Sequence, residues 1–117
     1  MATEAGSEIS FDDFLRVDIR AGTILSATDN VRARKPAYVL EVDFGPDFGI
    51  KTTSAQITEE HSKESLVGMQ VLAVVNFPMK RVAGVKSEVL TLATMEEDGR
   101  TVLITPSKPV PDGTRLL

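Results

Sequence analysis

The residues with the clearest binding chemistry stand in one short run, Asn76-Phe77-Pro78-Met79, which directly follows a block of apolar residues. Pro78 has no N–H to donate, so the chain is expected to leave its strand there. Phe77 and Met79 would then form an apolar floor, because a thioether adapts to irregular surfaces. Such a floor suits a nucleic-acid base or a hydrophobic side chain of an unfolded peptide, unless both residues simply plug the end of the fold. The cations that would form its rim are Lys80, Arg81 and Lys86.

Positive charge is gathered in two clusters, although the chain as a whole is acidic, with a net charge of −4 over 117 residues. Proteins that coat nucleic acid usually carry a positive balance, because neutralising phosphates supplies most of their affinity. The net charge therefore argues against a coating role and leaves room for a local basic patch. The alternative for either cluster is ordinary solvated surface charge. The first cluster comprises Arg32, Arg34 and Lys35, and the second comprises Lys80, Arg81 and Lys86.

Groups that could perform catalysis or hold a metal are scarce. The chain has no cysteine, and His61 is its only histidine, which argues against a catalytic zinc site. A serine nucleophile would need His61 as its base, yet this residue stands in a charged, solvated stretch. The acidic pairs Asp12-Asp13 and Glu96-Glu97 are adjacent in sequence, so their side chains diverge. With no glycine-rich phosphate loop either, we expect a protein that is not an enzyme and that holds no cofactor and no metal.

The aromatic residues are too few for a row of stacking rings. The chain has five phenylalanines, one tyrosine and no tryptophan. Phe11 and Phe14 suit a first helical turn and Phe44 suits a strand face, which leaves Phe48 and Phe77. A protein that binds single-stranded nucleic acid of any sequence stacks successive bases on several aromatic rings. Phe77, beside the basic residues, is therefore the more informative of the two.

The elements that must position these residues begin with a helical turn and a long strand. Ser10 and Asp13 match a capping box, which predicts a turn over Phe11–Leu15. Apolar and polar residues alternate from Val17 onward, as in a half-buried strand, and the alternation then slips by one residue. Gly22 is a natural site for the β-bulge that such a slip requires.

The middle of the chain predicts two more strands and a helix. Residues 37–44 alternate, and residues 45–49 contain two glycines and a proline, which is strong turn chemistry. Residues 50–54 can return as the third strand. Residues 58–66 are polar and suit a helix of about two turns, with Thr58 as N-cap and Gly68 near its end. The apolar face of the second strand would consist of Tyr38, Leu40, Val42 and Phe44.

The rest of the chain supplies further short strands. Val71–Val75 is apolar and mostly β-branched, whereas Val82–Val85 is short and interrupted by Gly84. Residues 89–94 and 102–105 flank Asp98-Gly99, which predicts a hairpin. Five or more short strands, a bulged first strand and a helix between the third and fourth strands indicate an all-β fold. We predict an OB-type five-stranded Greek-key barrel with short helices and an extended C-terminal tail.

A single domain is expected over residues 9–117, after a flexible N-terminus of residues 1–8. The first nine residues lack the basic and apolar regions of a secretory signal, and no stretch is long enough to span a membrane, so we expect a cytoplasmic protein without membrane insertion. Prolines keep the tail, residues 106–117, from forming a helix. Its apolar residues Val110, Leu116 and Leu117 either fold back on the barrel or dock on a partner.

Several runs, taken together in their order and spacing, resemble the CsaA family of export-related chaperones, which lies within the tRNA-binding-domain superfamily of OB folds. The resemblance extends over residues 9–117. The runs are Asp18-Ile19-Arg20-Ala21-Gly22-Thr23-Ile24, Ser54-Ala55-Gln56-Ile57, Ala73-Val74-Val75-Asn76-Phe77-Pro78, the segment from Lys80 to Leu90, and Pro109-Val110-Pro111-Asp112-Gly113-Thr114.

This resemblance implies a homodimer in which the tail, residues 106–117, contributes to the interface. It implies binding of unfolded preproteins and of preprotein translocase components, and it implies the tRNA binding of the superfamily. The family's nucleic-acid face would use Ser54, Gln56, Asn76, Lys80, Arg81, Lys86 and Ser87. The loop between the first two strands, which OB folds use for oligonucleotides, would add Arg32, Arg34 and Lys35.

Two departures distinguish this chain from most tRNA-binding members of the superfamily. Those members have Gly-Met after the position of Ser87, where this chain has Glu88-Val89, and Lys-Leu where it has Lys35-Pro36. Glu88 would place an anion among the expected phosphate ligands, unless it faces inward or meets Lys86. CsaA-like proteins share both departures. They therefore support a chaperone for unfolded precursor proteins, with a tRNA-binding module as the alternative.

Overall fold

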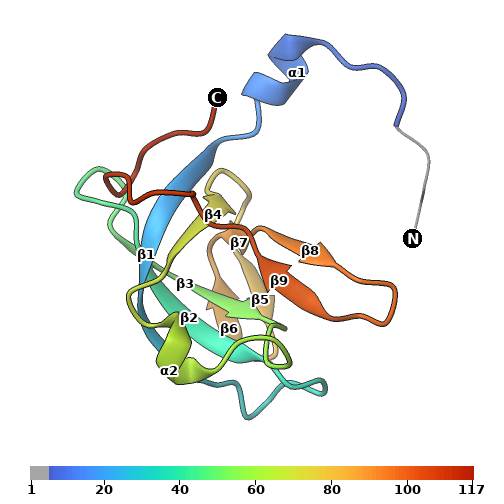
Figure 1. Ribbon diagram of the computed structural model, residues 1–117, viewed down its shortest axis with the longest axis vertical. Helices are drawn as coiled ribbons and strands as arrows, with labels where there is room; N and C mark the ends of the chain where they lie inside the picture. Colours follow the sequence, from blue (N-terminus) through green and yellow to red (C-terminus); the bar gives the residue numbers. More distant parts are fainter. Residues whose placement is uncertain (1–5) are drawn as a thin grey trace.

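The computed structural model describes residues 6–117 and contains a five-stranded antiparallel sheet coiled into a nearly closed barrel (Figure 1). Two short hairpins and two short helices complete the fold, so the predicted all-β, OB-type architecture is confirmed. The sheet order is β3 (Ile50–Ala55), β2 (Tyr38–Asp43), β1 (Ile19–Asp29), β4 (Gln70–Val74) and β7 (Leu90–Thr91). The hairpins are β5 (Lys80–Val82) with β6 (Val85–Ser87), and β8 (Ala93–Met95) with β9 (Thr101–Leu103). The helices are α1 (Phe11–Leu15) and α2 (Lys63–Leu66).

Strand β1 is long enough to serve two neighbours, pairing with β4 through its first half and with β2 through its second. The register with β2 shifts between Ile24 and Ser26, so the bulge follows Ile24. The prediction of a bulge at Gly22 was therefore wrong. Gly22 has another role, because a Cβ there would lie 2.8 Å from the Phe44 ring and 2.7 Å from Val42 Cγ1. Only glycine therefore lets these two buried side chains approach β1.

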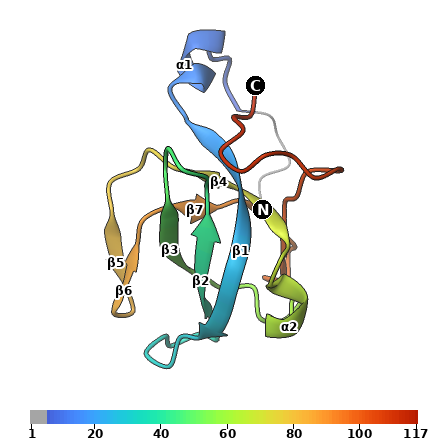
Figure 2. The same cartoon turned by 90° about the vertical axis from the view of Figure 1, so that its left-hand side faces the viewer.

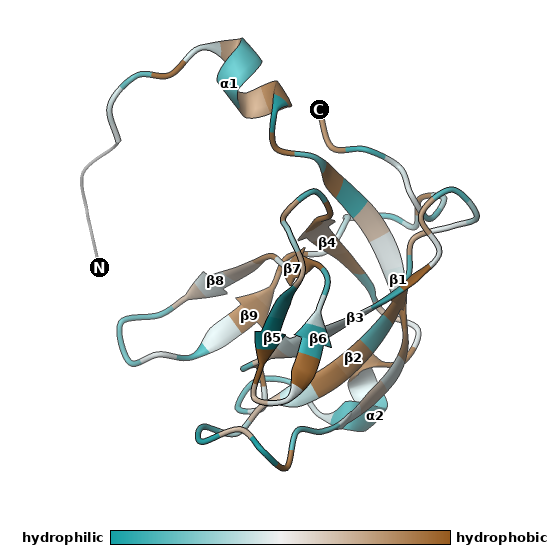
Figure 3. Ribbon diagram, turned by 180° about the vertical axis from the view of Figure 1, so that it is seen from behind, coloured by the Kyte–Doolittle hydropathy of each residue, from teal (hydrophilic) through white to brown (hydrophobic). Residues whose placement is uncertain are grey.

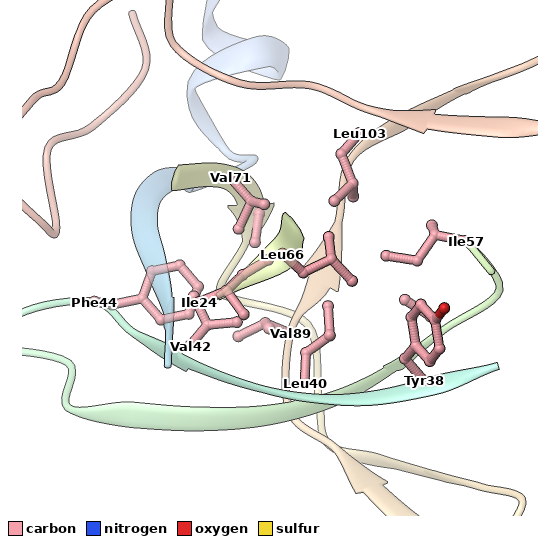
Figure 4. Close-up of a cluster of buried hydrophobic side chains, with 12 residues drawn as sticks. Ile24, Tyr38, Leu40, Val42, Phe44, Ile57, Leu66, Val71, Val89 and Leu103 are labelled. Atoms are coloured by element: carbon pink, nitrogen blue, oxygen red, sulfur yellow. The ribbon is translucent and has the colours of Figure 1, made fainter. Parts of the chain in front are cut away.

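The core fills the inside of the barrel with side chains from all the long strands (Figure 4). Strand β2 contributes every second residue, as its alternation predicted, because successive side chains of a strand point to opposite faces. Tyr38 closes one end, and its hydroxyl donates to the carbonyl of His61 at 2.8 Å. The largest side chains that are almost wholly buried are Phe44, Ile24, Leu40, Leu66, Val42 and Val71.

Helix α2 is shorter than the helix predicted over residues 58–66. Ser62 is its N-cap in place of Thr58, with an extended backbone and a hydroxyl that accepts from the Ser65 N–H. The preceding turn is held by tertiary contacts, since the Leu103 N–H donates to His61 Nε2 at 3.2 Å and Tyr38 binds the His61 carbonyl. These long-range hydrogen bonds favour a non-helical backbone before Ser62. Helix propensity reflects only local sequence, so it could not predict them.

The segment predicted as one interrupted strand over Val82–Val85 is the turn of a hairpin. Ala83 and Gly84 both have positive φ, of 46° and 82°, which is the geometry of a two-residue turn between antiparallel strands. The hairpin β5–β6 stands at the side of the barrel next to β3 (Figure 2). The hairpin predicted at Asp98-Gly99 is confirmed as β8–β9.

The C-terminal tail folds back on its own barrel, which is one of the two alternatives left by its pattern. Its backbone runs beside the start of β1, where Gly113 N–H donates to the Ala21 carbonyl at 2.8 Å and Leu116 N–H donates to the Ile19 carbonyl at 2.9 Å. The side chain of Leu117 nevertheless stays 96% exposed. The dimer contact expected of the tail therefore remains a prediction.

The N-terminal helix α1 begins with the expected capping box, in which Ser10 and Asp13 each bind the other's backbone N–H. Of the flexible N-terminus expected over residues 1–8, residues 1–5 lie outside the described part of the chain. No helix within residues 6–117 has the length and apolarity to cross a membrane.

Candidate ligand-binding site

A cavity of about 330 Å³ opens where the chain leaves β4 and enters the β5–β6 hairpin. Phe77, Pro78 and Lys80 line it, together with Ser54 of β3 and Ser87 of β6. Phe77 and Met79 are 52% and 53% exposed, so they do not form a buried plug of the barrel end. Phe77 offers an apolar surface to the cavity, whereas Met79, which was predicted to share this floor, does not line it. The cavity also reaches Thr53, Val82, Glu88, Val89 and Leu90, of which sequence reasoning singled out Glu88 alone.

The wall of this cavity on the β3 side is held by hydrogen bonds. Thr53 Oγ1 donates to the Val89 carbonyl at 2.8 Å and lies 2.9 Å from Ser87 Oγ. Ser54 Oγ accepts from Asn30 Nδ2 at 3.2 Å. Because both serine hydroxyls already have protein partners, they are oriented before any ligand arrives.

Asn76, a predicted site residue, ties the mouth to the N-terminal segment. Its Oδ1 accepts from the Asp18 N–H at 3.0 Å, and its Nδ2 donates to the Arg16 carbonyl at 2.7 Å. Both ends of the amide are thus used within the chain. Its role in this structure is to position Phe77, the next residue.

Glu88 is bonded to β3, and no cation of the β5–β6 hairpin, Lys86 included, lies within 4 Å of its carboxylate in the described residues. Its N–H donates to the Thr52 carbonyl at 2.8 Å, and its carboxylate accepts from the Thr52 N–H at 3.1 Å. Lys51 Nζ lies 3.8 Å from the same carboxylate. The acid that departs from the common superfamily pattern therefore joins β3 to the segment before β7, and its charge is partly offset by a lysine of its own barrel.

The cations of the hairpin lie on its two faces. Lys80 pairs with Ser87 and lines the cavity, whereas Arg81 pairs with Lys86 on the opposite face. Among residues 6–117, no carboxylate lies within 4 Å of these three cations or of Arg32, Arg34 and Lys35. All six are free to contact an anionic ligand.

The two basic clusters meet in space at the turn of the hairpin. Arg32, from the loop between β1 and β2, lies so close to Gly84 that a Cβ there would stand 2.7 Å from its Cδ. Arg32 thereby extends the basic surface of the hairpin, which Figure 3 shows as hydrophilic along β5. The two clusters are far apart in the sequence, which gave no reason to join them. Gly84 was the only local signal for this contact.

Two predicted site residues lie away from the mouth. Gln56 and Lys35 line another cavity, also of about 330 Å³, between the end of β3 and the β8–β9 hairpin. In this cavity Arg100 binds Asp98 at 2.8 Å and Glu60 at 3.3 Å. The structure thus divides the predicted site into a mouth and a second, more polar region. Within residues 6–117 there is no group of three or more potential metal ligands.

Comparison with known proteins identifies the family of this chain. The family described as "Putative tRNA binding domain" matches residues 19–115. The structure of chaperone CsaA from Bacillus anthracis is 49% identical, with a TM-score of 0.89, and the match covers 95% of this chain and 100% of that one. The chain belongs to the CsaA family. The CsaA chaperone from Picrophilus torridus is 42% identical, with a TM-score of 0.86, over 94% of this chain and 100% of its own.

The family is also related to a domain of larger proteins. Methionine–tRNA ligase of Flavobacterium johnsoniae is 36% identical over 105 residues, which are 90% of this chain. The match covers 14% of the ligase, so this CsaA-family chain spans only a small part of the curated relatives that it matches. Both the chaperones and the ligases therefore share the domain described above.

Proposed function

We propose that this CsaA-family chain is a chaperone that binds unfolded precursor proteins during protein export. The observation that carries this proposal is the half-exposed Phe77 in the lining of a cavity of about 330 Å³, with half-exposed Met79 two residues further along the chain. Unfolded chains differ from folded ones mainly in the apolar side chains that they expose. An apolar mouth that admits varied side chains, beside a free cation such as Lys80, suits such a client.

The protein works in the cytoplasm, catalyses no reaction and needs no cofactor or metal. Its partners are unfolded preproteins and components of the preprotein translocase. It acts as a homodimer.

The N-terminal helix supports the homodimer. Helix α1 stands apart from the barrel, beside the C-terminal segment (Figures 1 and 2), and buries none of its side chains. Arg115 Nη2 donates to the Leu15 carbonyl at 2.6 Å, which holds the two segments together. A second copy of the chain would cover the apolar side chains that they expose. These are Ile9, Phe11, Leu15, Val17, Leu116 and Leu117.

The peptide-binding proposal is tested by measuring the affinity of the full chain for a panel of unfolded preprotein peptides. Phe77→Ala removes the ring of the mouth and should weaken binding by about tenfold, because burying half an aromatic side chain contributes about 1–2 kcal/mol. Val67→Ala is the matched control, since Val67 is 54% exposed and does not line the mouth. Equal binding by wild type and Phe77→Ala would reject the site, and no binding by either would reject the function.

A second candidate function, tRNA binding, is favoured by the joined basic clusters. Arg32, Lys80, Arg81 and Lys86 lie on the β5–β6 hairpin or beside its turn, and none of them has a carboxylate partner among residues 6–117. If about three of them contact phosphates of a single-stranded region, the logarithm of the affinity should fall with the logarithm of salt with a slope of roughly −2. Filter binding of tRNA at several salt concentrations measures this slope. A flat dependence, or unchanged affinity after Lys80 and Arg81 are both replaced by alanine, would reject tRNA binding.

A further inference from the structure

His61, the single histidine of the chain, joins the segment before α2 to strand β9. Its Nε2 accepts a hydrogen bond from the Leu103 N–H at 3.2 Å. Its carbonyl accepts from the Tyr38 hydroxyl at 2.8 Å, and its own N–H donates to the Ile57 carbonyl at 3.2 Å. The backbone of His61 is thus fixed by the barrel, and its side chain supplies an acceptor to β9.

The N–H of Leu103 depends on this imidazole because the strand register turns it away from β8. The next residue, Ile104, donates its N–H to the Leu92 carbonyl at 3.0 Å, on the β8 side. Neighbouring residues of an antiparallel strand direct their N–H groups to opposite sides, so Leu103 directs its own away from its β8 partner Ala93. Leu103 is 5% exposed and belongs to the core (Figure 4). Without the imidazole acceptor, a nearly buried backbone donor would be unpaired, which costs the desolvation of that group.

Acid adds its proton to the accepting nitrogen itself. A neutral imidazole carries one proton, and Nε2 of His61 can accept an N–H only when that proton is on Nδ1. No buried side-chain nitrogen of the described residues lacks a partner, so Nδ1, which has none there, reaches solvent. Histidine side chains gain their charge between about pH 8 and pH 5. The added proton places an N–H on Nε2, opposite the Leu103 N–H, and the hydrogen bond is lost.

Charged groups of the neighbouring segments form no ion pair with the imidazole. The segment of His61 carries Glu59, Glu60, Lys63 and Glu64, the β8–β9 hairpin carries Glu96, Glu97, Asp98 and Arg100, and β1, the β1–β2 loop and β2 carry Asp29, Lys35 and Tyr38. Glu60 is bound to Arg100, and Lys63 is bound to Asp29. Within residues 6–117, no carboxylate oxygen lies within 4 Å of an imidazole nitrogen. In the described part of the chain, the imidazole has the Leu103 N–H as its hydrogen-bond partner.

This bond is one of three polar contacts that hold the β8–β9 hairpin against residues 56–61. Thr101 Oγ1 donates to the Gln56 carbonyl at 2.6 Å, and Arg100 binds Glu60 at 3.3 Å. Carboxylic acids ordinarily titrate near pH 4 and hydroxyl groups do not titrate near neutral pH. Mild acid therefore acts on the contact of His61 and leaves the other two in place.

The base of the hairpin is attached to the barrel by different bonds. The Leu92 N–H donates to the Leu72 carbonyl of β4 at 2.8 Å, and the Leu72 N–H donates to the Ile104 carbonyl at 3.3 Å. Beyond this base, the hairpin projects from the barrel (Figure 1). The cavity of about 330 Å³ that Gln56 and Lys35 line lies between this projecting part and the end of β3. A weaker attachment of the projecting part would widen this cavity.

We propose that His61 is an acid-sensitive contact that controls how closely the β8–β9 hairpin lies against residues 56–61. With a neutral imidazole, β9 is bound and the cavity beside Gln56 keeps its width. With a protonated imidazole, the hairpin turns outward about its base and the cavity opens. This inference is independent of the proposed function, because neither His61 nor any residue of the hairpin lines the mouth at Phe77.

The test follows amide hydrogen exchange of the full chain by NMR between about pH 7.5 and pH 5, the range in which histidine titrates. Each rate is divided by that of an unstructured chain at the same pH, which gives a protection factor free of the direct effect of acid. The protection factor of Leu103 should fall about tenfold, because its N–H becomes unpaired. The midpoint should coincide with the titration of the His61 ring protons. Ile104, whose N–H is bonded on the β8 side, should keep its protection and is the internal control.

Three variants separate the roles of the side chain. His61→Gln offers an amide oxygen and cannot titrate in this range, so the protection of Leu103 should not depend on pH. His61→Phe keeps a ring without an acceptor, so Leu103 should be weakly protected at every pH. Glu60→Gln removes the charge that binds Arg100 and keeps the imidazole, so it is the matched control in which the pH dependence should persist.

Four results would overturn the inference. One is an unchanged protection factor of Leu103 while the imidazole titrates, and another is an imidazole that stays neutral down to about pH 5. An equal loss of protection at Ile104 would show a general loosening of the barrel and no local opening. Persistence of the pH dependence in His61→Gln would assign it to a different group.

Discussion

Glu88 and Thr52 are joined by two hydrogen bonds, one from the Glu88 N–H to the Thr52 carbonyl at 2.8 Å and one from the Thr52 N–H to the Glu88 carboxylate at 3.1 Å. This reciprocal contact holds the edge of β3 against the segment before β7 and so closes one end of the barrel seam. The acid that weakens the case for phosphate binding is thus a structural residue.

Glu88→Ala should lower the free energy of unfolding by about 1–2 kcal/mol, because it leaves the Thr52 N–H without its acceptor. Glu88→Gln keeps an acceptor and should retain most of the stability. Urea unfolding of the three proteins measures the difference. Equal stability of wild type and Glu88→Ala would show that the side-chain bond contributes nothing to closure.

Gly22→Ala should destabilise the barrel by about 1–3 kcal/mol or more, because its Cβ would overlap Val42 and the Phe44 ring, neither of which can move to solvent. The control is Gly6→Ala, where nothing lies within 4 Å. Thermal unfolding should show a lower Tm for Gly22→Ala than for wild type. The Tm of Gly6→Ala should equal that of wild type. A neutral Gly22→Ala would mean that β1 and β2 are less closely packed than described.

Gly84→Ala should weaken tRNA binding by displacing Arg32 from the hairpin turn. Its Cβ would stand 2.6 Å from the Arg32 guanidinium, and the φ of 82° adds backbone strain of about 1 kcal/mol. Gly99→Ala carries the strain alone, since φ is 91° and no atom lies within 4 Å. If Arg32→Ala and Gly84→Ala act through the same contact, the double variant should bind tRNA no more weakly than Arg32→Ala. Fully additive losses would contradict this.

Acid should remove a small stabilising contribution of Asp98. The Arg100 N–H donates to its carboxylate at 3.2 Å and holds the pKa of Asp98 below its ordinary value, with the guanidinium adding to the effect. A pKa that is lower in the folded state stabilises the protein above the unfolded pKa, near 4, and this stability is lost as pH falls through the folded pKa. Wild type should therefore exceed Asp98→Asn in stability at neutral pH, and the gap should shrink on acidification below about pH 4. A gap independent of pH would exclude the charge as its cause.

Light scattering tests the dimer. Wild type should have twice the mass of its 12.7 kDa chain, and Phe11→Ser should shift it toward the monomer by removing the most exposed apolar side chain of α1. Val67→Ser, on another surface, is the matched control and should remain a dimer. A monomeric wild type at all accessible concentrations would contradict the dimer and the interface together.

Features that depend on neighbouring residues were predictable from the sequence. The capping box of Ser10 and Asp13, the buried face of β2 and the Asp98-Gly99 hairpin all follow from local hydrogen bonding, strand alternation and turn chemistry. The mouth at Phe77 was predictable for the same reason, because Pro78 ends the strand at that point.

Features that depend on residues far apart in the chain were decided only by the tertiary structure. The bulge after Ile24, the shorter α2, the tail beside β1 and the contact of Arg32 with Gly84 each result from partners distant in sequence. The amino-acid sequence by itself determined which residues could bind. Tertiary packing decided which of them lie together and which, like Glu88 and Asn76, are already engaged within the barrel.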